Sequence, residues 1–149
     1  MPHLRLQVPE EWLRDEFKRS TGFDANKLLD HLVQVVANLR MENPATPGFS
    51  VPMINLSNLK HAIEPLHYAH VGGDASKRFL HVTLSAGNDT PGRTAAVRLR
   101  AAQTLGEEAD KFVGALPGLA SLTVHVQDID RDRGYSTTAE RKKKREQEQ

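Results

Sequence analysis

The order in which two hydrophobic periodicities alternate along this chain is the strongest constraint on its fold. Short segments with every second residue apolar occur at residues 4–8, 80–84 and 122–126, and a less regular segment runs from about residue 59 to 69. Two longer segments, near residues 25–39 and 91–116, instead have apolar residues three and four apart, which is typical of one buried helix face. The predicted order is strand, helix, strand, and then the same again.

This order predicts an α/β fold in which two β-α-β repeats share one four-stranded sheet. Each helix must cross over to return the chain to a parallel strand, so both helices are expected on a single face of the sheet. The other face would carry Phe79 and Thr83 among polar side chains. Because a half-covered sheet of this kind usually packs against a partner, the pattern also predicts an oligomer.

Local signals predict where the two helices begin and end. Asp24 is suited to cap the first helix, and the prolines at 44 and 47 follow its end. Thr90 could cap the second helix with Pro91 at its first position, and Pro117-Gly118 would end it. Its buried face is expected to comprise Ala95, Leu99, Ala102, Leu105, Ala109, Phe112 and Leu116.

Two further segments allow weaker predictions. Residues 9–22 favour a short amphipathic helical turn that buries Trp12, Leu13 and Phe17. Pro65 lies within the least regular strand and cannot donate a backbone hydrogen bond, which favours an edge strand or a bulge there.

Size and composition indicate one ordinary globular domain. A length of 149 residues is enough for a sizeable core, and we expect residues 1–135 to form the domain and residues 136–149 a charged, solvated tail. The net charge of +1 gives no electrostatic case for nucleic acid or a membrane surface as partner. The absence of cysteine, and of a signal-peptide pattern at the start, favours the cytoplasm.

Pro2 stands immediately before the first predicted strand. If Met1 is removed, this residue carries a secondary amine at the head of an ordered element. Pro2 shares strand parity with Leu4 and Leu6, so apolar surroundings are expected. Burial lowers the pKa of an amine from its usual value near 8, because the charged form is desolvated.

Four segments of the chain form a recognisable combination: the N-terminal MPH, FLHVTLSAGNDTPGR ending at Arg93, KHAIE, and LTVHVQDIDRDRGYS. Together they resemble the tautomerase superfamily, and within it the 5-carboxymethyl-2-hydroxymuconate isomerases of homoprotocatechuate degradation. The resemblance covers most of residues 2–8 and 55–137, whereas residues 9–54 match only in containing a helix. The resemblance implies a homotrimer whose three sheets enclose a central core.

The resemblance also implies the chemistry. The amine of Pro2 would be the general base that takes a proton from a dienol and returns one further along the conjugated chain, without a metal or organic cofactor. The substrate would be a small dicarboxylate, and Arg93 would bind one carboxylate and stabilise the developing enolate. Arg98 also falls where the family tends to have an arginine.

One segment departs from the family pattern. An arginine pair is expected just before His61, but the chain has Ser57, Asn58 and Leu59. Lys60 could supply a charge for substrate binding, although it would point to the opposite face of a true strand. The departure leaves the substrate, and retention of the family activity, open.

Other features of the sequence allow different interpretations. His67 and His70 are three residues apart, yet no further ligand stands at a convincing zinc spacing, so the sequence favours no metal site. Histidines 81 and 125 fit an exposed or interface strand face. A non-catalytic oligomeric binding protein on the same scaffold is the alternative function, and retention of Met1 would favour it because the Pro2 nitrogen would then be an amide.

Overall fold

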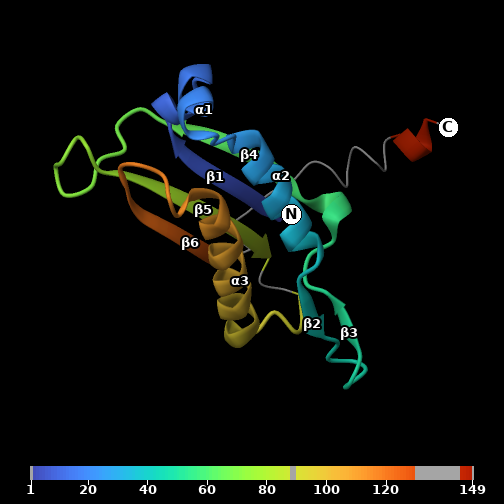
Figure 1. The fold of residues 1–149 in the computed structure, drawn as a ribbon. Coiled ribbons are helices and arrows are strands. Elements are labelled where there is room, and N and C mark those ends of the chain that lie inside the picture. The colour runs from blue at the N-terminus through green and yellow to red at the C-terminus, as the bar shows by residue number, and fades with distance from the viewer. Residues whose placement is uncertain (1, 88–89, 130–144, 149) are drawn as a thin grey trace.

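A four-stranded mixed sheet forms the centre of the fold (Figure 1). The computed structural model describes residues 2–87, 90–129 and 145–148. The strands β1 (His3–Pro9), β4 (Lys60–Leu66), β5 (Arg78–Gly87) and β6 (Leu119–Ile129) lie in the order β4-β1-β5-β6. Strand β4 is parallel to β1 and β6 is parallel to β5, whereas the two central strands are antiparallel. This topology confirms the two predicted β-α-β units.

Helices α2 (Ala25–Ala37) and α3 (Ala95–Val113) pack side by side on one face of the sheet (Figure 1). The core lies between them and the strands, where alternate residues of the two central strands are fully buried: Leu4, Leu6, Val8, Leu80, Val82 and Leu84. Asp24 caps α2 as predicted, because its carboxylate accepts hydrogen bonds from the backbone N–H groups of Asn26 and Lys27.

The predicted start of the second helix is wrong. Thr94, rather than Thr90, is the N-cap, and its hydroxyl accepts a hydrogen bond of 3.3 Å from the backbone N–H of Val97. Residues before it form a turn in which Gly92 has a φ of +93°. A Cβ at this glycine would lie 3.0 Å from the carbonyl oxygen of Glu42. Both the backbone conformation and the close approach therefore require glycine, and they delay the helix.

The buried face of α3 also differs from the prediction. Leu105 and Ala109 are buried as expected, but Leu99 and Phe112 are 60% and 40% exposed. The other buried positions are Ala101 and Val113. This face carries two alanines, whose small side chains let the helix approach its neighbours closely, and apolar spacing alone did not distinguish it from the face with Leu99.

The chain between β1 and α2 forms a 3₁₀ turn, η1 (Glu10–Leu13), and a short helix, α1 (Asp15–Thr21). Trp12 is buried and stacks on Phe17 with ring centroids 5.1 Å apart. The predicted helical packing is therefore present for these two residues, whereas Leu13 is 39% exposed and was wrongly placed in the core.

Two short strands project from the sheet beyond α2 (Figure 1). Strands β2 (Arg40–Glu42) and β3 (Ser50–Pro52) form an antiparallel hairpin, and a 3₁₀ turn, η2 (Leu56–Asn58), follows. The sequence prediction contained no hairpin here. Its strands have three residues each, which is too short for alternation to be recognised.

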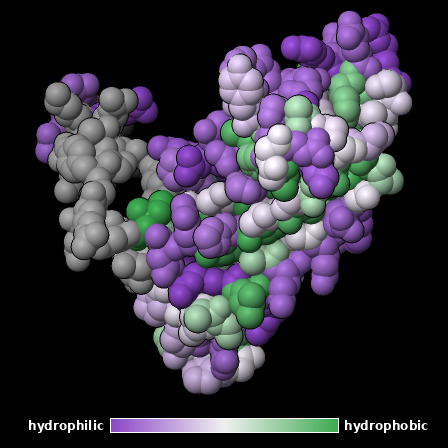
Figure 2. Space-filling view, turned by 90° about the vertical axis from the view of Figure 1, so that its left-hand side faces the viewer, coloured by the Kyte–Doolittle hydropathy of each residue, from purple (hydrophilic) through white to green (hydrophobic). Residues whose placement is uncertain are grey.

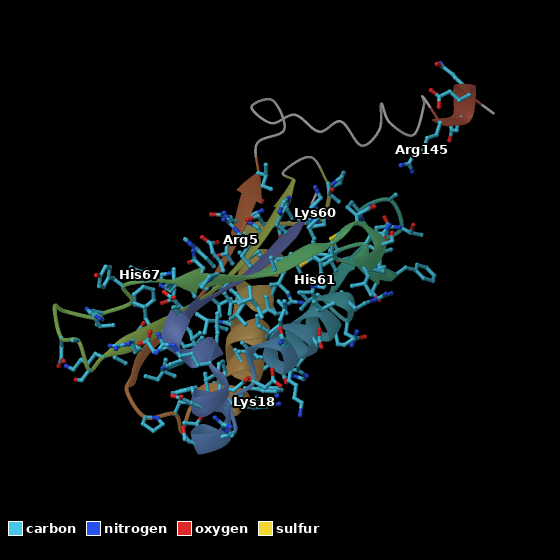
Figure 3. All side chains as sticks on the ribbon, turned by 90° about the horizontal axis from the view of Figure 1, so that it is seen from above. Arg5, Lys18, Lys60, His61, His67 and Arg145 are labelled. Atoms are coloured by element: carbon cyan, nitrogen blue, oxygen red, sulfur yellow. The ribbon has the colours of Figure 1, made fainter. Side chains whose placement is uncertain are left out.

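The sheet face opposite the helices carries mostly polar side chains. Cross-strand register places on it His3, Arg5, Gln7, Lys60, Glu64, Phe79, His81, Thr83, Ser85, Thr123, His125 and Gln127. We call this set the open face. Figure 3 shows Arg5 and Lys60 on the side of the sheet away from the helices, and Lys18 on the helical side. Pro65 lies in β4, which is an edge strand, as predicted.

Figure 2 views the molecule from the end where β1 finishes and β5 and β6 begin. Hydrophilic residues predominate there, and hydrophobic residues reach the surface in a narrow band. Among the described residues, no helix is long and apolar enough to cross a membrane. The predicted boundary near residue 135 lies outside the described residues, so the division into domain and tail stays a prediction.

Candidate active site

Pro2 lies at the end of the sheet where strands β1 and β4 begin. Its carbonyl oxygen accepts a hydrogen bond of 3.0 Å from the backbone N–H of Lys60, which continues the pairing of the two strands. On the other side, His3 is opposite Ser85, so one further step of the same register places Pro2 beside Ala86. Pro2 is half-buried and shares the parity of Leu4, which faces the helices.

Arg93 lies in the turn before α3, and its side chain extends to the same end of the sheet. Its Nε donates a hydrogen bond of 2.9 Å to the carbonyl oxygen of Met53, and one terminal nitrogen donates a bond of 3.1 Å to that of Gly87. Gly87 follows Ala86, the neighbour of Pro2. The structure therefore places Pro2 and Arg93 at the same end of the sheet. Arg93 precedes α3, however, and does not lie in its first turn as the sequence suggested.

Two charged residues that the prediction did not combine lie beside Arg93. A terminal nitrogen of Arg98 is 3.3 Å from a carboxylate oxygen of Asp128 and also donates a hydrogen bond of 2.5 Å to the carbonyl oxygen of Arg93. Arg98 was recognised from the sequence as a candidate, whereas Asp128 was not. Strand alternation could have identified it. Asp128 follows Val124 and Val126 at every second position of β6, so it falls on the helical face, where an acidic residue is unexpected.

Lys60 does not lie on the same face as these residues. It is aligned with His3 and exposed on the open face, as strand parity indicated (Figure 3). Burial lowers the pKa of His3 below its usual value, and the positive charges of Lys60 and Arg5 lower it further. The described residues thus separate two cationic groups, with Arg93 and Arg98 on the helical side and Lys60 and Arg5 on the open face.

Two cavities lie elsewhere on the described surface. The larger, about 520 Å³, is at the opposite end of the sheet, between Trp12, Phe17, Arg78 and Gly118. The second, about 420 Å³, lies between the hairpin and Pro91, two residues from Arg93. Neither of these two cavities is lined by Pro2 or Arg93.

The histidines of the described residues do not gather into a metal centre. No group of three or more histidine and acidic residues in residues 2–87, 90–129 and 145–148 is arranged to hold a metal ion. His67 instead pairs with Glu10 at 2.8 Å.

No model of a protein family matches this chain, and no curated protein matches its sequence. Solved structures do match it. A 5-carboxymethyl-2-hydroxymuconate delta-isomerase is 17% identical with a TM-score of 0.62, covering 91% of this chain and 86% of its own. A 5-carboxymethyl-2-hydroxymuconate isomerase from Deinococcus radiodurans R1 is 17% identical with a TM-score of 0.63, covering 91% and 87%.

A further match is described as a symmetric trimer of fused 4-OT. It is 15% identical with a TM-score of 0.56, and the alignment covers 91% of this chain and 92% of that one. At these identities the likeness shows the fold. The chain has the α/β fold of these structures, so the fold that the sequence-based resemblance implied is confirmed.

Proposed function

We propose that this chain is a cofactor-independent isomerase of an enol or dienol carboxylic acid, with the amine of Pro2 as general base once Met1 has been removed. The observation that carries the proposal is the position of Pro2. It immediately precedes the central strand β1, is half-buried on the helical face, and lies at the same end of the sheet as Arg93.

A proline amine at this position suits proton transfer. Partial burial disfavours the charged form of an amine, so we expect the pKa of the Pro2 amine to lie below the ordinary value of about 8. The neutral amine takes the proton of the enol hydroxyl, and the resulting ammonium returns a proton to a carbon further along the conjugated chain. No electrons are gained or lost overall, so the reaction needs no redox partner.

Arg93 supplies the complementary charge. A guanidinium binds a carboxylate through two parallel hydrogen bonds, and it also stabilises the negative charge that forms on the enolate oxygen. Its bonds to the carbonyl oxygens of Met53 and Gly87 fix the group before substrate arrives. This preorganisation is what electrostatic catalysis requires.

The assembly and the substrate follow from the resemblance. The open face and the fused 4-OT trimer support a homotrimer, and 5-carboxymethyl-2-hydroxymuconate, which carries three carboxylates, is the first enol acid to test. Lys60 would take part in substrate binding only if a neighbouring subunit brings another site to the open face. The cytoplasmic location, and the absence of nucleic-acid and membrane partners, stay predictions from the sequence.

The decisive experiment compares free and blocked amines. We expect intact mass spectrometry of natively expressed protein to show a chain that starts at Pro2 and that isomerises a dienol acid. Protein that retains Met1, or whose amine has been acetylated, should fold and assemble normally but lose activity, because an amide nitrogen is not basic.

Pro2→Ala is the matched variant, since it keeps an amine at the same position and should retain part of the activity. Equal rates for the blocked and free proteins would contradict the proline mechanism. Tight binding of enol acids without turnover by the free protein would favour the non-catalytic binding protein.

A further inference from the structure

We propose that Asp128 determines substrate preference at this site by neutralising Arg98, so that the site accepts an enol acid with one carboxylate in preference to one with two. This inference rests on the proposed function and narrows its substrate class. The structural basis is the row of residues that joins Pro2 to Asp128 across the sheet.

The row follows from strand register. Pro2 lies beside Ala86 by one step beyond the pairing of His3 with Ser85, and Ala86 pairs with Asp128 on β6. Adjacent strands are about 4.8 Å apart, so two strand spacings separate Pro2 from Asp128 by about 10 Å. All three residues have the parity of Leu4 and so share the helical face. Asp128 therefore places a carboxylate within reach of a small substrate held at Pro2.

Arg98 forms an ion pair with the carboxylate of Asp128. One of its terminal nitrogens lies 3.3 Å from a carboxylate oxygen of Asp128 and donates a hydrogen bond to the carbonyl oxygen of Arg93, and the two charged side chains are 28% and 36% exposed. A second substrate carboxylate could bind Arg98 only by displacing Asp128 or by accepting its repulsion. A neutral substrate end meets neither cost.

Other nearby cations do not compensate on this face. Lys60 and Arg5 lie on the open face, and Arg5 is 3.8 Å from Glu64. The turn that ends at Leu59, next to Pro2 on its other side, carries no charged side chain. The hydrogen bonds and strand register place Arg93 and the Arg98–Asp128 pair on the helical side of this end of the sheet.

The test uses two ligands of equal length that cannot isomerise as enols: hexa-2,4-dienoate, with one carboxylate, and hexa-2,4-dienedioate, with two. Isothermal titration calorimetry should show that the unmodified protein binds the monocarboxylate at least as tightly as the dicarboxylate. Asp128→Asn should shift the affinity ratio roughly tenfold or more toward the dicarboxylate, which is the equivalent of one charge-assisted contact.

Two controls separate this role from general effects of charge. Asp30→Asn removes the same charge from an exposed position on α2 and should leave the ratio unchanged. Adding Arg98→Gln to Asp128→Asn should abolish the gain in dicarboxylate affinity, because the released guanidinium is then absent. A merely structural role of Asp128 would weaken both ligands alike and leave their ratio constant.

The outcomes also separate this inference from the proposed function. Acetylation of the amine should abolish turnover but preserve the ratio of affinities, so a lack of activity alone would count only against the proline base. Tighter dicarboxylate binding by the unmodified protein, an unchanged ratio in Asp128→Asn, or no binding of either ligand would each overturn the inference. The comparison of the two ligands on the unmodified protein needs no variant, so it tests the inference even if Asp128→Asn misfolds.

Discussion

At the scale of single residues, Arg93 connects parts of the chain that are distant in sequence. It donates hydrogen bonds to the carbonyl oxygens of Met53 and Gly87, both in part-buried surroundings. We expect Arg93→Ala to lower the free energy of unfolding by about 1–3 kcal/mol, because two acceptors lose a charged donor. If Arg93 also binds the substrate carboxylate, kcat/KM should fall roughly ten- to a thousandfold.

Denaturant titration and steady-state kinetics on a dienol acid separate these two effects of Arg93→Ala. Arg100→Ala, at an exposed position of α3, is the matched control and should change neither. A loss of stability with unchanged kinetics in the folded variant would leave Arg93 with a structural role alone.

His3 should make the stability of the fold depend on pH. Burial, and next the charge of Lys60, lower its pKa in the folded protein below the ordinary value of 6.5. Between these two pKa values the unfolded chain binds more protons than the folded one, so the free energy of unfolding falls as the pH drops below about 6.5. Above that pH the contribution of His3 is constant.

Urea titrations between pH 7.5 and 5 test this expectation. His3→Gln should weaken the pH dependence, whereas His70→Gln, at an exposed position, should not. An identical pH profile for His3→Gln and the unmodified protein would contradict the assignment.

At the scale of elements, the first turn of α2 is held by one side chain. Asp24 accepts hydrogen bonds of 3.0 and 3.3 Å from the N–H groups of Asn26 and Lys27, and it pairs with Lys18 at 3.0 Å. We expect Asp24→Ala to lower the free energy of unfolding by about 0.5–2 kcal/mol, the usual effect of losing an N-cap. Thermal unfolding should show this loss of stability for Asp24→Ala. Asp30→Ala, at an exposed position of the same helix, is the control and should be about as stable as the unmodified protein. Equal losses of stability in the two variants would argue against a capping role of Asp24.

The same element shows why part of the fold could be read from the sequence. Asp24 directly precedes α2, and the apolar spacing of the helix is local, so the helix and its N-cap were predicted correctly. The start of α3 depends instead on contact between Gly92 and the carbonyl oxygen of Glu42, fifty residues earlier. Thr90 and Thr94 are equivalent caps until that contact is known, and local reasoning chose the wrong one.

The candidate site shows the same division. Pro2 could be singled out because its position at the chain start and its strand parity are both visible in the sequence. The Arg98–Asp128 pair could not, since it depends on β6 lying beside β5 and on α3 lying above it. Lys60 was named for its charge, and the structure shows that strand parity was the better guide to its direction.

At the scale of the whole molecule, the open face is the surface that an assembly would cover. Thr83 lies near its centre, opposite Arg5 on β1 and His125 on β6, and its side chain takes no part in the buried core. If three copies pack through these faces, Thr83→Arg should disrupt the assembly, because it adds a bulky cation next to Arg5. The fold of the single chain should persist, since the core lies on the other side of the sheet.

Sedimentation velocity at micromolar concentration tests this expectation. The unmodified protein should sediment as a trimer, and Thr83→Arg as a smaller species with an unchanged far-ultraviolet circular dichroism spectrum. Gln103→Arg adds the same charge at an exposed position on α3 and should remain trimeric. A monomeric unmodified protein would contradict the assembly directly, and a Thr83→Arg trimer would show that the subunits meet through another surface. Pro2 and Arg93 lie in the same subunit, so a dissociated Thr83→Arg protein should keep its activity if one subunit is sufficient. Loss of activity on dissociation would indicate that a neighbouring subunit completes the site.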